Sequence, residues 1–276
     1  MLHRQKRIDA LLREAARQIS DAGIEDSELE AQLLLQWLTS LCRSQLVLKA
    51  GEELETAMAE QYLHLIGRRC QRIPLQHLTG VQGFWSLELI VSPAVLIPRP
   101  ETEFLLEQVF ATVSHRPELR VLDMCTGSGA IALVLAQELS CRVVAVDLSV
   151  DALSIARRNR AKYQLEGLVE LVQSDLFSGL QPAFKYDCIV SNPPYIVDAA
   201  IDFLEPEVAL AEPRMALSGG EDGLAWIRRI IASASTFLRP GGWLFLEIGA
   251  DQKTAVEHLF QEAGSVYEQI QVVTDY

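Results

Sequence analysis

Apolar residues recur at helical spacing through the first 72 residues of the chain. The clearest stripe consists of Ile8, Leu11, Leu12, Ala15, Ala16 and Ile19. Residues 26–40 and 51–70 continue this periodicity, and Asp26 or Ser27 is the expected N-cap of the first of these two helices. Because no segment here alternates with the period of a strand, the pattern predicts a helical N-terminal domain over residues 1–72.

The pattern changes after residue 72, where short apolar and aromatic runs are separated by turn-forming residues. These residues are Gly80, Gly83, Pro93, Pro98 and Pro100. Glycines and prolines at this density punctuate short strands and turns. Residues 73–98 are therefore predicted to form a β-hairpin linker between two domains.

Strand-like apolar runs then alternate with helical segments. The runs lie at 119–123, 142–147, 168–173, 186–191 and 243–249, with a sixth at 266–276. Helices are expected from about Gly129 and over residues 149–163 and 251–263. Such alternation indicates a mostly parallel sheet with helices on both faces, so residues 99–276 are predicted to be an α/β, Rossmann-like domain.

Composition and charge narrow the class of protein. No run approaches the ~20 apolar residues of a membrane helix, the N-terminus lacks the pattern of a secretory signal, and the five cysteines show no metal-ligand spacing. We therefore expect a soluble, cytoplasmic protein without a metal site. Residues 76–276 carry −12 of the net charge of −13. That balance argues against binding of long nucleic acid, which usually requires a basic face.

A turn of small residues follows the first strand of the sheet, which ends in Asp123. The turn consists of Cys125, Thr126, Gly127, Ser128 and Gly129. Glycines let a ligand approach the backbone, and the N-terminus of the following helix directs free N–H groups at it. The dinucleotide fingerprint needs a further glycine where this chain has Ala132, which weakens an NAD-dependent alternative. Two roles stay open for Asp123, contact with the ligand or pinning of the turn.

Two further acids follow the next strands. Asp147 ends the second strand, where a carboxylate can accept hydrogen bonds from both hydroxyls of a ribose. Asp175 follows the third strand, where an acid can accept from an adenine amino group. Simpler roles stay open as well, a helix cap for Asp147 and a solvated loop acid for Asp175. Together with the turn, the two acids predict an adenosine-containing ligand, and S-adenosyl-L-methionine fits this description.

The fourth strand is followed by Asn192, Pro193, Pro194 and Tyr195. The prolines make the segment rigid, and the carboxyl edge of an open α/β sheet is where ligands bind. The Asn192 side-chain oxygen and the Pro193 carbonyl can each accept one N–H of a planar NH₂ group, which makes its nitrogen a better nucleophile. Tyr195 can stack on the same group. The motif predicts methyl transfer to a carboxamide or a nucleobase amine; the alternative is a turn stiffened by proline.

These residues resemble a known family, the peptide chain release factor glutamine methyltransferases. The most specific stretches are PLQHLTGVQGFWSLELIVSPAVLIPRPETE, VLDMCTGSGAIAL, VSNPPYI and EPEVALAEPRMALSGGEDGL. The resemblance covers nearly the whole chain. It implies a helical N-terminal domain, a hairpin linker and a class I methyltransferase domain.

The resemblance also implies a reaction and its site. The substrate would be the glutamine of the Gly-Gly-Gln motif of class 1 release factors, methylated on its side-chain nitrogen by S-adenosyl-L-methionine. Asn192 to Tyr195 would hold this glutamine, with Asn192, Pro193 and Tyr195 as the catalytic residues. The cofactor would contact Asp123, Cys125, Thr126, Gly127, Ser128, Gly129, Asp147, Asp175, Leu176 and Asn192.

The chain departs from the family pattern in two places. Many members have glycine at the position of Cys125. A cysteine there restricts the backbone conformations open to the turn. The family also continues beyond the position of Tyr276 into a final antiparallel strand, so we expect an open strand edge if the chain is complete. Roles near the active site stay open for Phe84, Arg99 and Glu101, since Pro100 and Glu101 also suit the first turn of a helix.

Three other functions stay open beside the glutamine methyltransferase. A nucleic-acid methyltransferase acting on adenine or guanine would use the same planar NH₂ group, but the acidic charge balance argues against it. A catalytically silent adaptor could keep the same fold, and an NAD-dependent oxidoreductase would leave residues 192–195 without a role. The N-terminal helices show no catalytic residues, so we expect them to dock the release factor. We expect a monomer that binds neither nucleic acid directly nor membranes.

Overall fold

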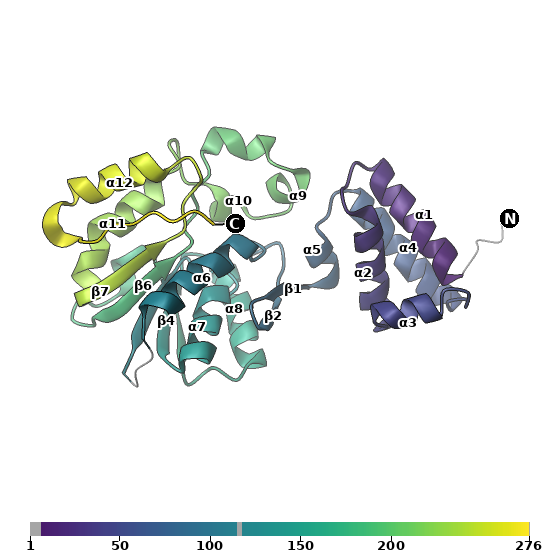
Figure 1. Cartoon of the computed structure of the whole chain (residues 1–276), viewed down its shortest axis with the longest axis horizontal. Coiled ribbons are helices and arrows are strands. Elements are labelled where there is room, and N and C mark those ends of the chain that lie inside the picture. The colour runs from purple at the N-terminus through teal and green to yellow at the C-terminus, as the bar shows by residue number, and fades with distance from the viewer. Residues whose placement is uncertain (1–6, 115–117, 276) are drawn as a thin grey trace. The chain divides into compact units, whose positions relative to one another are not determined.

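The computed structural model describes residues 7–114 and 118–275, and it divides into two compact units. One unit ends at Gly80 and the other begins at Val81. Figure 1 shows the first unit in purple and blue and the second from blue-teal to yellow. Residues 1–6 of the predicted helical domain and Tyr276 lie outside the described residues.

The first unit is helical, as predicted from its apolar periodicity. Its helices are α1 (Ile8–Asp21), α2 (Ser27–Thr39), α3 (Arg43–Leu48), α4 (Thr56–Cys70) and α5 (Leu75–Thr79). The predicted stripe on α1 is largely buried against α2 and α4, with Ile8 and Ile19 in the shared core. Tyr62 is fully buried and donates its hydroxyl to the Ala31 carbonyl at 2.8 Å, which ties α4 to α2.

The second unit begins with an antiparallel hairpin, β1 (Val81–Phe84) and β2 (Leu87–Ile90). Trp85 makes the tight turn with a positive φ of 54°. The hairpin lies inside the predicted range 73–98, but α5 precedes it and belongs to the first unit. The division into residues 1–72, 73–98 and 99–276 with separate roles stays a prediction.

A five-stranded parallel sheet forms the centre of the second unit. Its strands are β3 (Arg120–Met124), β4 (Arg142–Asp147), β5 (Val169–Gln173), β6 (Tyr186–Ser191) and β7 (Leu238–Leu246), in the order β5-β4-β3-β6-β7. The longer helices are α6 (Pro100–Thr112), α7 (Ala130–Leu139), α8 (Val150–Lys162), α11 (Ala225–Phe237) and α12 (Lys253–Glu262). Shorter helices are η1 (Leu176–Gly179), η2 (Asp198–Phe203), α9 (Pro206–Ala209), α10 (Arg214–Leu217) and η3 (Gly264–Val266).

Helices cover both faces of this sheet (Figure 1), and alternate strand residues pack against opposite layers of them. Val121 and Val143 lie in the core formed with α6 and α7. Leu122, next to Val121, and Val146, three residues after Val143, point to the other face and lie in the core formed with α11. Because side chains alternate along a strand, continuous apolar runs are what a sheet covered on both faces requires. The predicted Rossmann-like α/β architecture is confirmed.

The predicted sixth strand is wrong for the described part of the C-terminal segment. Residues 267–275 form no strand, and most of them are exposed. Gln269 has a φ of 55°, a left-handed conformation that interrupts an extended run. A strand also needs a partner, and β7 is paired only with β6 among the residues described.

The order of the strands places the site. The chain reverses direction across the sheet at β3, which has β4 on one side and β6 on the other. A crevice at the carboxyl ends of the strands is expected at such a switch point.

No helix among the described residues has both the length and the apolar character needed to span a bilayer.

Candidate active site

A cavity of about 340 Å³ lies at the carboxyl ends of β3, β4, β5 and β6. Its walls include the turn after β3, the end of β4 and the beginning of the 192–195 segment. Residues from two other stretches also line it, 93–98 after the hairpin and 213–216 around α10. The cavity brings together eight of the predicted site residues: Cys125, Thr126, Gly127, Ser128, Asp147, Leu176, Asn192 and Pro194.

The turn after β3 takes the conformation for which its glycines are suited. Gly127 and Gly129 have φ values of 55° and 86°. A Cβ on Gly129 would also lie 3.3 Å from the Leu133 side chain, a tight contact added to the strain of the positive φ, so this position favours glycine. Cys125 has a φ of 62°, which explains why glycine suits the equivalent position in the family it resembles. The Cys125 side chain lines the cavity.

Asp123 lies beneath this turn and does not line the cavity. Its side chain is fully buried and accepts hydrogen bonds from the Thr126 hydroxyl at 2.5 Å and from the Ala132 amide at 3.1 Å. Burial raises the pKa of its carboxyl to about 7. Of the two open roles for Asp123, the geometry favours pinning the turn over contact with a ligand.

Asp147 lines the cavity from the end of β4. One carboxylate oxygen accepts from the Gly127 amide at 2.8 Å and the other from the Ser149 amide at 2.9 Å. Partial burial raises its pKa, while these two amides act in the opposite direction. Ser149, not Asp147, caps α8 through its hydroxyl, so the helix-cap role is filled by another residue. Each oxygen of Asp147 keeps a lone pair for a further donor.

Asp175 is not brought to the cavity with the other predicted residues. Its carboxylate forms an exposed ion pair with Arg229 at 2.8 Å, whereas its neighbours Ser174 and Leu176 line the cavity. The guanidinium of Arg229 lies 5.1 Å from the centre of the Trp226 ring, and Trp226 is itself a cavity residue. This geometry is closer to the loop-acid role than to contact with an adenine.

The segment from Asn192 to Tyr195 follows β6 directly. Asn192 and Pro194 line the cavity, whereas Pro193 is buried behind them. The Tyr195 carbonyl accepts from the Gln252 side chain at 2.9 Å, and a Cβ on Gly223 would lie 2.6 Å from this carbonyl oxygen. Neighbouring backbone therefore approaches closely and fixes the far end of the segment.

Two residues that the sequence did not indicate hold Asn192. The Asn192 amide nitrogen donates to the Thr102 hydroxyl at 2.9 Å, and Thr102 donates to Glu247 at 2.7 Å. Tyr195 donates its hydroxyl to the other oxygen of Glu247 at 3.3 Å. Partial burial raises the pKa of Glu247. Thr102 lies inside the PETE stretch, where local signals indicate only a helix start, so contact with Asn192 is visible only in three dimensions.

The residues with open roles near this site lie outside the cavity. Phe84 is in the core with 1% of its surface exposed. One guanidinium nitrogen of Arg99 donates to both oxygens of buried Glu212, at 2.8 and 3.0 Å, which joins the start of α6 to the segment before α10. Glu101 is exposed in the first turn of α6, and Pro100 occupies its first position, as the helix-start pattern predicts.

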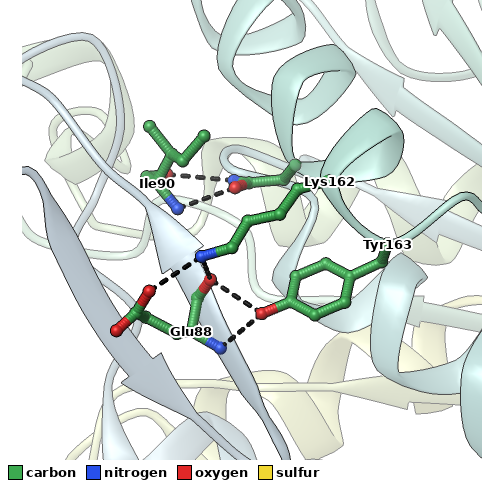
Figure 2. Close-up of polar contacts among 5 residues, drawn as sticks. Glu88, Ile90, Lys162 and Tyr163 are labelled. Carbon is green, nitrogen blue, oxygen red and sulfur yellow. Dashed lines mark hydrogen bonds and ion pairs between the residues drawn. The ribbon is translucent and has the colours of Figure 1, made fainter.

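The hairpin is fastened to α8 by polar contacts on its second strand. Figure 2 shows Lys162 and Tyr163 reaching the backbone of Glu88. The Lys162 ammonium also pairs with the Glu88 carboxylate at 2.8 Å. The Tyr163 hydroxyl both donates to the Glu88 carbonyl at 2.8 Å and lies 2.7 Å from the Glu88 amide nitrogen. These contacts are exposed, so each contributes little alone.

A buried contact lies about one turn earlier in the same helix. Asn159 is fully buried, accepts from the Ile90 amide at 2.7 Å and donates to the Ile90 carbonyl at 2.9 Å. Its amide nitrogen also donates to the Ser128 carbonyl at 2.9 Å. One side chain therefore connects the hairpin, and through it the 93–98 wall of the cavity, to the turn after β3.

The described residues include no group of three or more His, Cys, Asp or Glu side chains placed to hold a metal ion. What the cavity offers is a glycine turn, the carboxylates of Asp147 and Asp151, and an amide beside rigid prolines, at the switch point of a parallel sheet. This fold and site define a class I methyltransferase.

Comparison with known proteins gives the family. Residues 10–80 match the PrmC N-terminal domain, and residues 100–221 match the methyltransferase small domain. A release factor glutamine methyltransferase of Moorella thermoacetica is 45% identical over 96% of this chain and 93% of that protein. The Escherichia coli protein of the same name is 40% identical over the same shares. The chain belongs to the release factor glutamine methyltransferase family.

A solved structure agrees with the fold alone. The hMettl16 catalytic domain superposes with a TM-score of 0.51 at 16% sequence identity, over 76% of this chain and 74% of that one. At this level of identity the likeness concerns the arrangement of strands and helices, which matches the sheet described above.

Proposed function

We propose that this protein methylates the side-chain nitrogen of the glutamine in the Gly-Gly-Gln motif of class 1 release factors. The methyl donor is S-adenosyl-L-methionine, which leaves as S-adenosyl-L-homocysteine. One observation carries the proposal: a single cavity is lined by the glycine turn, by Asp147 and by Asn192. A methyl donor and a planar amide can therefore lie in the same space.

The turn after β3, Asp147 and Leu176 form one end of the cavity, which we call the cofactor end. These residues fit an adenosine-containing donor. The free lone pairs of Asp147 suit the two hydroxyls of a ribose, since its other lone pairs already hold the Gly127 and Ser149 amides. Leu176 offers an apolar surface for a base, and the turn from Cys125 to Ser128 offers close backbone approach. When bound, the donor supplies an electrophilic methyl group on a sulfonium.

The segment that begins at Asn192 forms the other end, which we call the chemical end, and it positions the glutamine amide that receives the methyl group. The Asn192 side-chain oxygen and the Pro193 carbonyl each accept one N–H of the glutamine amide, which raises the electron density on its nitrogen. Proline restricts the backbone here, which limits the positions open to the Pro193 carbonyl before the substrate binds. Transfer would form the nitrogen–carbon bond and break the carbon–sulfur bond, whose electron pair would stay on the sulfur, and the nitrogen would lose one proton to water.

We also propose that the helical N-terminal unit docks the release factor. Leu29, Leu33 and Trp37 follow one another at a spacing of four along α2, and 50%, 39% and 44% of their surfaces are exposed. Residues four apart share one face of a helix, so these three form an apolar stripe. We name it the α2 stripe. Exposed apolar stripes on a helix are typical of protein-binding faces.

Labelled S-adenosyl-L-methionine tests the substrate class. The protein is incubated with the label and an equal mixture of a class 1 release factor and total nucleic acid. Label in the release factor supports the proposal. Label confined to nucleic acid would show that the amino group held at Asn192 belongs to a base, and a protein that binds the donor without any transfer would be the silent adaptor.

A further inference from the structure

Three side chains from separate parts of the chain form a short relay beside the cavity. Thr102 comes from the first turn of α6, Asn192 follows β6 and Glu247 follows β7. The distances are 2.9 Å from the Asn192 nitrogen to the Thr102 oxygen and 2.7 Å from that oxygen to the Glu247 carboxylate. Thr102 is 5% exposed and lines the cavity beside Asn192.

The direction of each hydrogen bond follows from the chemistry of the end groups. A threonine hydroxyl has one proton to donate, and an ionised carboxylate can only accept. Thr102 must therefore donate its hydroxyl proton to Glu247 and accept a hydrogen bond from Asn192 through a lone pair. The only group of Asn192 able to donate is its NH₂ end. The carboxamide oxygen of Asn192 is consequently turned away from Thr102.

This direction matters because the two ends of a carboxamide have nearly the same shape. Packing alone distinguishes them poorly, and the hydrogen-bond partners decide which end faces which way. For a substrate amide that approaches with its NH₂ group, only the oxygen end of Asn192 is useful. The NH₂ end would place two donors against each other.

We propose that Thr102 and Glu247 are positioning residues that fix which end of the Asn192 carboxamide faces the substrate. This inference rests on the proposed function, since it assumes that Asn192 accepts from an amide NH₂. The Glu247 carboxylate acts on Asn192 both directly and through the Thr102 hydroxyl, which it holds as a donor. The relay thereby selects a donor group as substrate, whether it comes from glutamine or from another planar amine.

The surroundings of Glu247 agree with a role as a hydrogen-bond acceptor. Its two oxygens take the Thr102 and Tyr195 hydroxyls, and the Asn192 side chain also acts on the same carboxylate as a hydrogen-bond donor. Among the residues described, no Lys, Arg or His lies within ion-pair distance of it. A partly buried carboxylate held only by donors is costly as a packing element, which argues for a use in the site.

The decisive variant is Glu247→Gln, which keeps the shape and changes the polarity. The glutamine NH₂ can donate to Thr102, whose hydroxyl proton is then free to point at the Asn192 oxygen, so the carboxamide turns over. We expect kcat on the release factor to fall roughly 10²-fold, the scale of a misplaced catalytic dipole. The dissociation constant of the methyl donor, measured by calorimetry, should change less than about twofold, because the relay touches no residue of the turn or of Asp147.

Two Thr102 variants separate the relay from packing. Thr102→Val keeps the volume and removes the hydroxyl, and it should lower kcat as Glu247→Gln does. Thr102→Ser keeps the hydroxyl and should retain kcat within about threefold. Glu103→Gln is the matched control on the next residue of α6, because Glu103 only accepts from the Trp85 amide outside the cavity, and it should behave as the wild type.

A double variant shows whether Glu247 acts through Asn192. If it does, Glu247→Gln should cost nothing further in an Asn192→Ala background, because there is no carboxamide left to orient. Independent losses that multiply would overturn the inference, as would wild-type kcat in Glu247→Gln and Thr102→Val. A joint loss of kcat and donor affinity, with a lowered melting temperature, would show a structural role instead. Absence of release factor methylation by the wild type is a separate result, which contradicts the proposed function.

Discussion

The two ends of the cavity are built in different ways. At the cofactor end, the turn after β3 and Asp147 are adjacent to their strands, and their hydrogen bonds run mainly to backbone amides. At the chemical end, Asn192 depends on the side chains of Thr102 and Glu247, which are distant in sequence. The first end is therefore determined locally, whereas the second exists only when α6, β6 and β7 have come together.

This difference predicts that the two ends can be damaged separately. Changes at the chemical end should lower turnover and leave donor affinity intact, and changes at the cofactor end should do the reverse. The variants below test that separation.

The largest effect is expected for Asn192→Ala. Loss of the carboxamide oxygen removes one preorganised acceptor from the substrate nitrogen, so kcat should fall roughly 10²-fold or more. Donor affinity by calorimetry should be nearly unchanged. An equal loss of donor affinity would mean that Asn192 belongs to the cofactor end.

Asp147→Asn should affect the other end. Its new NH₂ group cannot accept from the Gly127 or Ser149 amide, and it cannot accept from a ribose hydroxyl. We expect donor affinity to fall roughly 10- to 100-fold, the range for hydrogen bonds to a charged group. Measured at saturating donor, kcat should stay close to that of the wild type, and a large fall there would contradict the separation.

Replacing the residues of the α2 stripe should affect neither end of the cavity. Replacing Leu29, Leu33 and Trp37 by serine should raise the KM for the intact release factor about tenfold, equivalent to ~1.4 kcal/mol of lost contact. The rate on a short Gly-Gly-Gln peptide should not change, because such a peptide reaches only the cavity. Serine at Val47 and Leu48, which are exposed on α3, is the matched control. Equal effects of the two sets would remove the assignment of docking to α2.

Asn159 tests whether the hairpin supports the cofactor end. Asn159→Ala leaves the Ser128 and Ile90 carbonyls without their donor, so the turn loses a fixed point. We expect about tenfold weaker donor binding, from loss of ~1.4 kcal/mol, and faster hydrogen exchange at the Ile90 amide. Lys162→Met removes contacts with Glu88 (Figure 2) and with the Tyr163 ring, none of which reaches the turn after β3, and should leave donor affinity unchanged. Weakened binding in both variants would assign the effect to the hairpin as a whole.

The smallest effect concerns backbone strain at the cofactor end. Cys125 has a positive φ, which costs a residue with a side chain roughly 1–2 kcal/mol. Cys125→Gly should therefore raise the free energy of unfolding by about 1 kcal/mol, after allowing for the flexibility of glycine. Ser140→Gly relieves a similar conformation at the end of α7 and serves as the control. A gain for Ser140→Gly alone would show that the Cys125 side chain contributes packing that offsets its strain.

The same difference explains how much the sequence could predict. The sheet, its helices and the turn after β3 follow from short-range patterns, because apolar periodicity and glycine positions act within a few residues. Asp147 could be placed for the same reason, as the last residue of a strand. Thr102 and Glu247 could not, since nothing local marks them as partners of Asn192. Asp175 is the opposite case: its position after β5 predicts a ligand contact, its side chain pairs with Arg229 in the structure, and the contact with an adenine stays a prediction.

The C-terminal segment shows a further limit of patterns. Residues 266–276 have enough apolar positions to suggest a strand, but a strand forms only where a partner edge and an extended backbone are both available. Gln269 leaves the extended conformation, and the segment runs without pairing through residue 275. Apolar pattern is thus a necessary condition for a strand here and not a sufficient one.

Mass spectrometry of a release factor peptide tests the central claim most directly. The purified factor is incubated with the protein and S-adenosyl-L-methionine, digested with trypsin, and the Gly-Gly-Gln peptide is fragmented. The account predicts one added methyl group on the glutamine side chain, absent when Asn192→Ala replaces the wild type. An unmodified glutamine after incubation with a wild-type protein that binds the donor would contradict it.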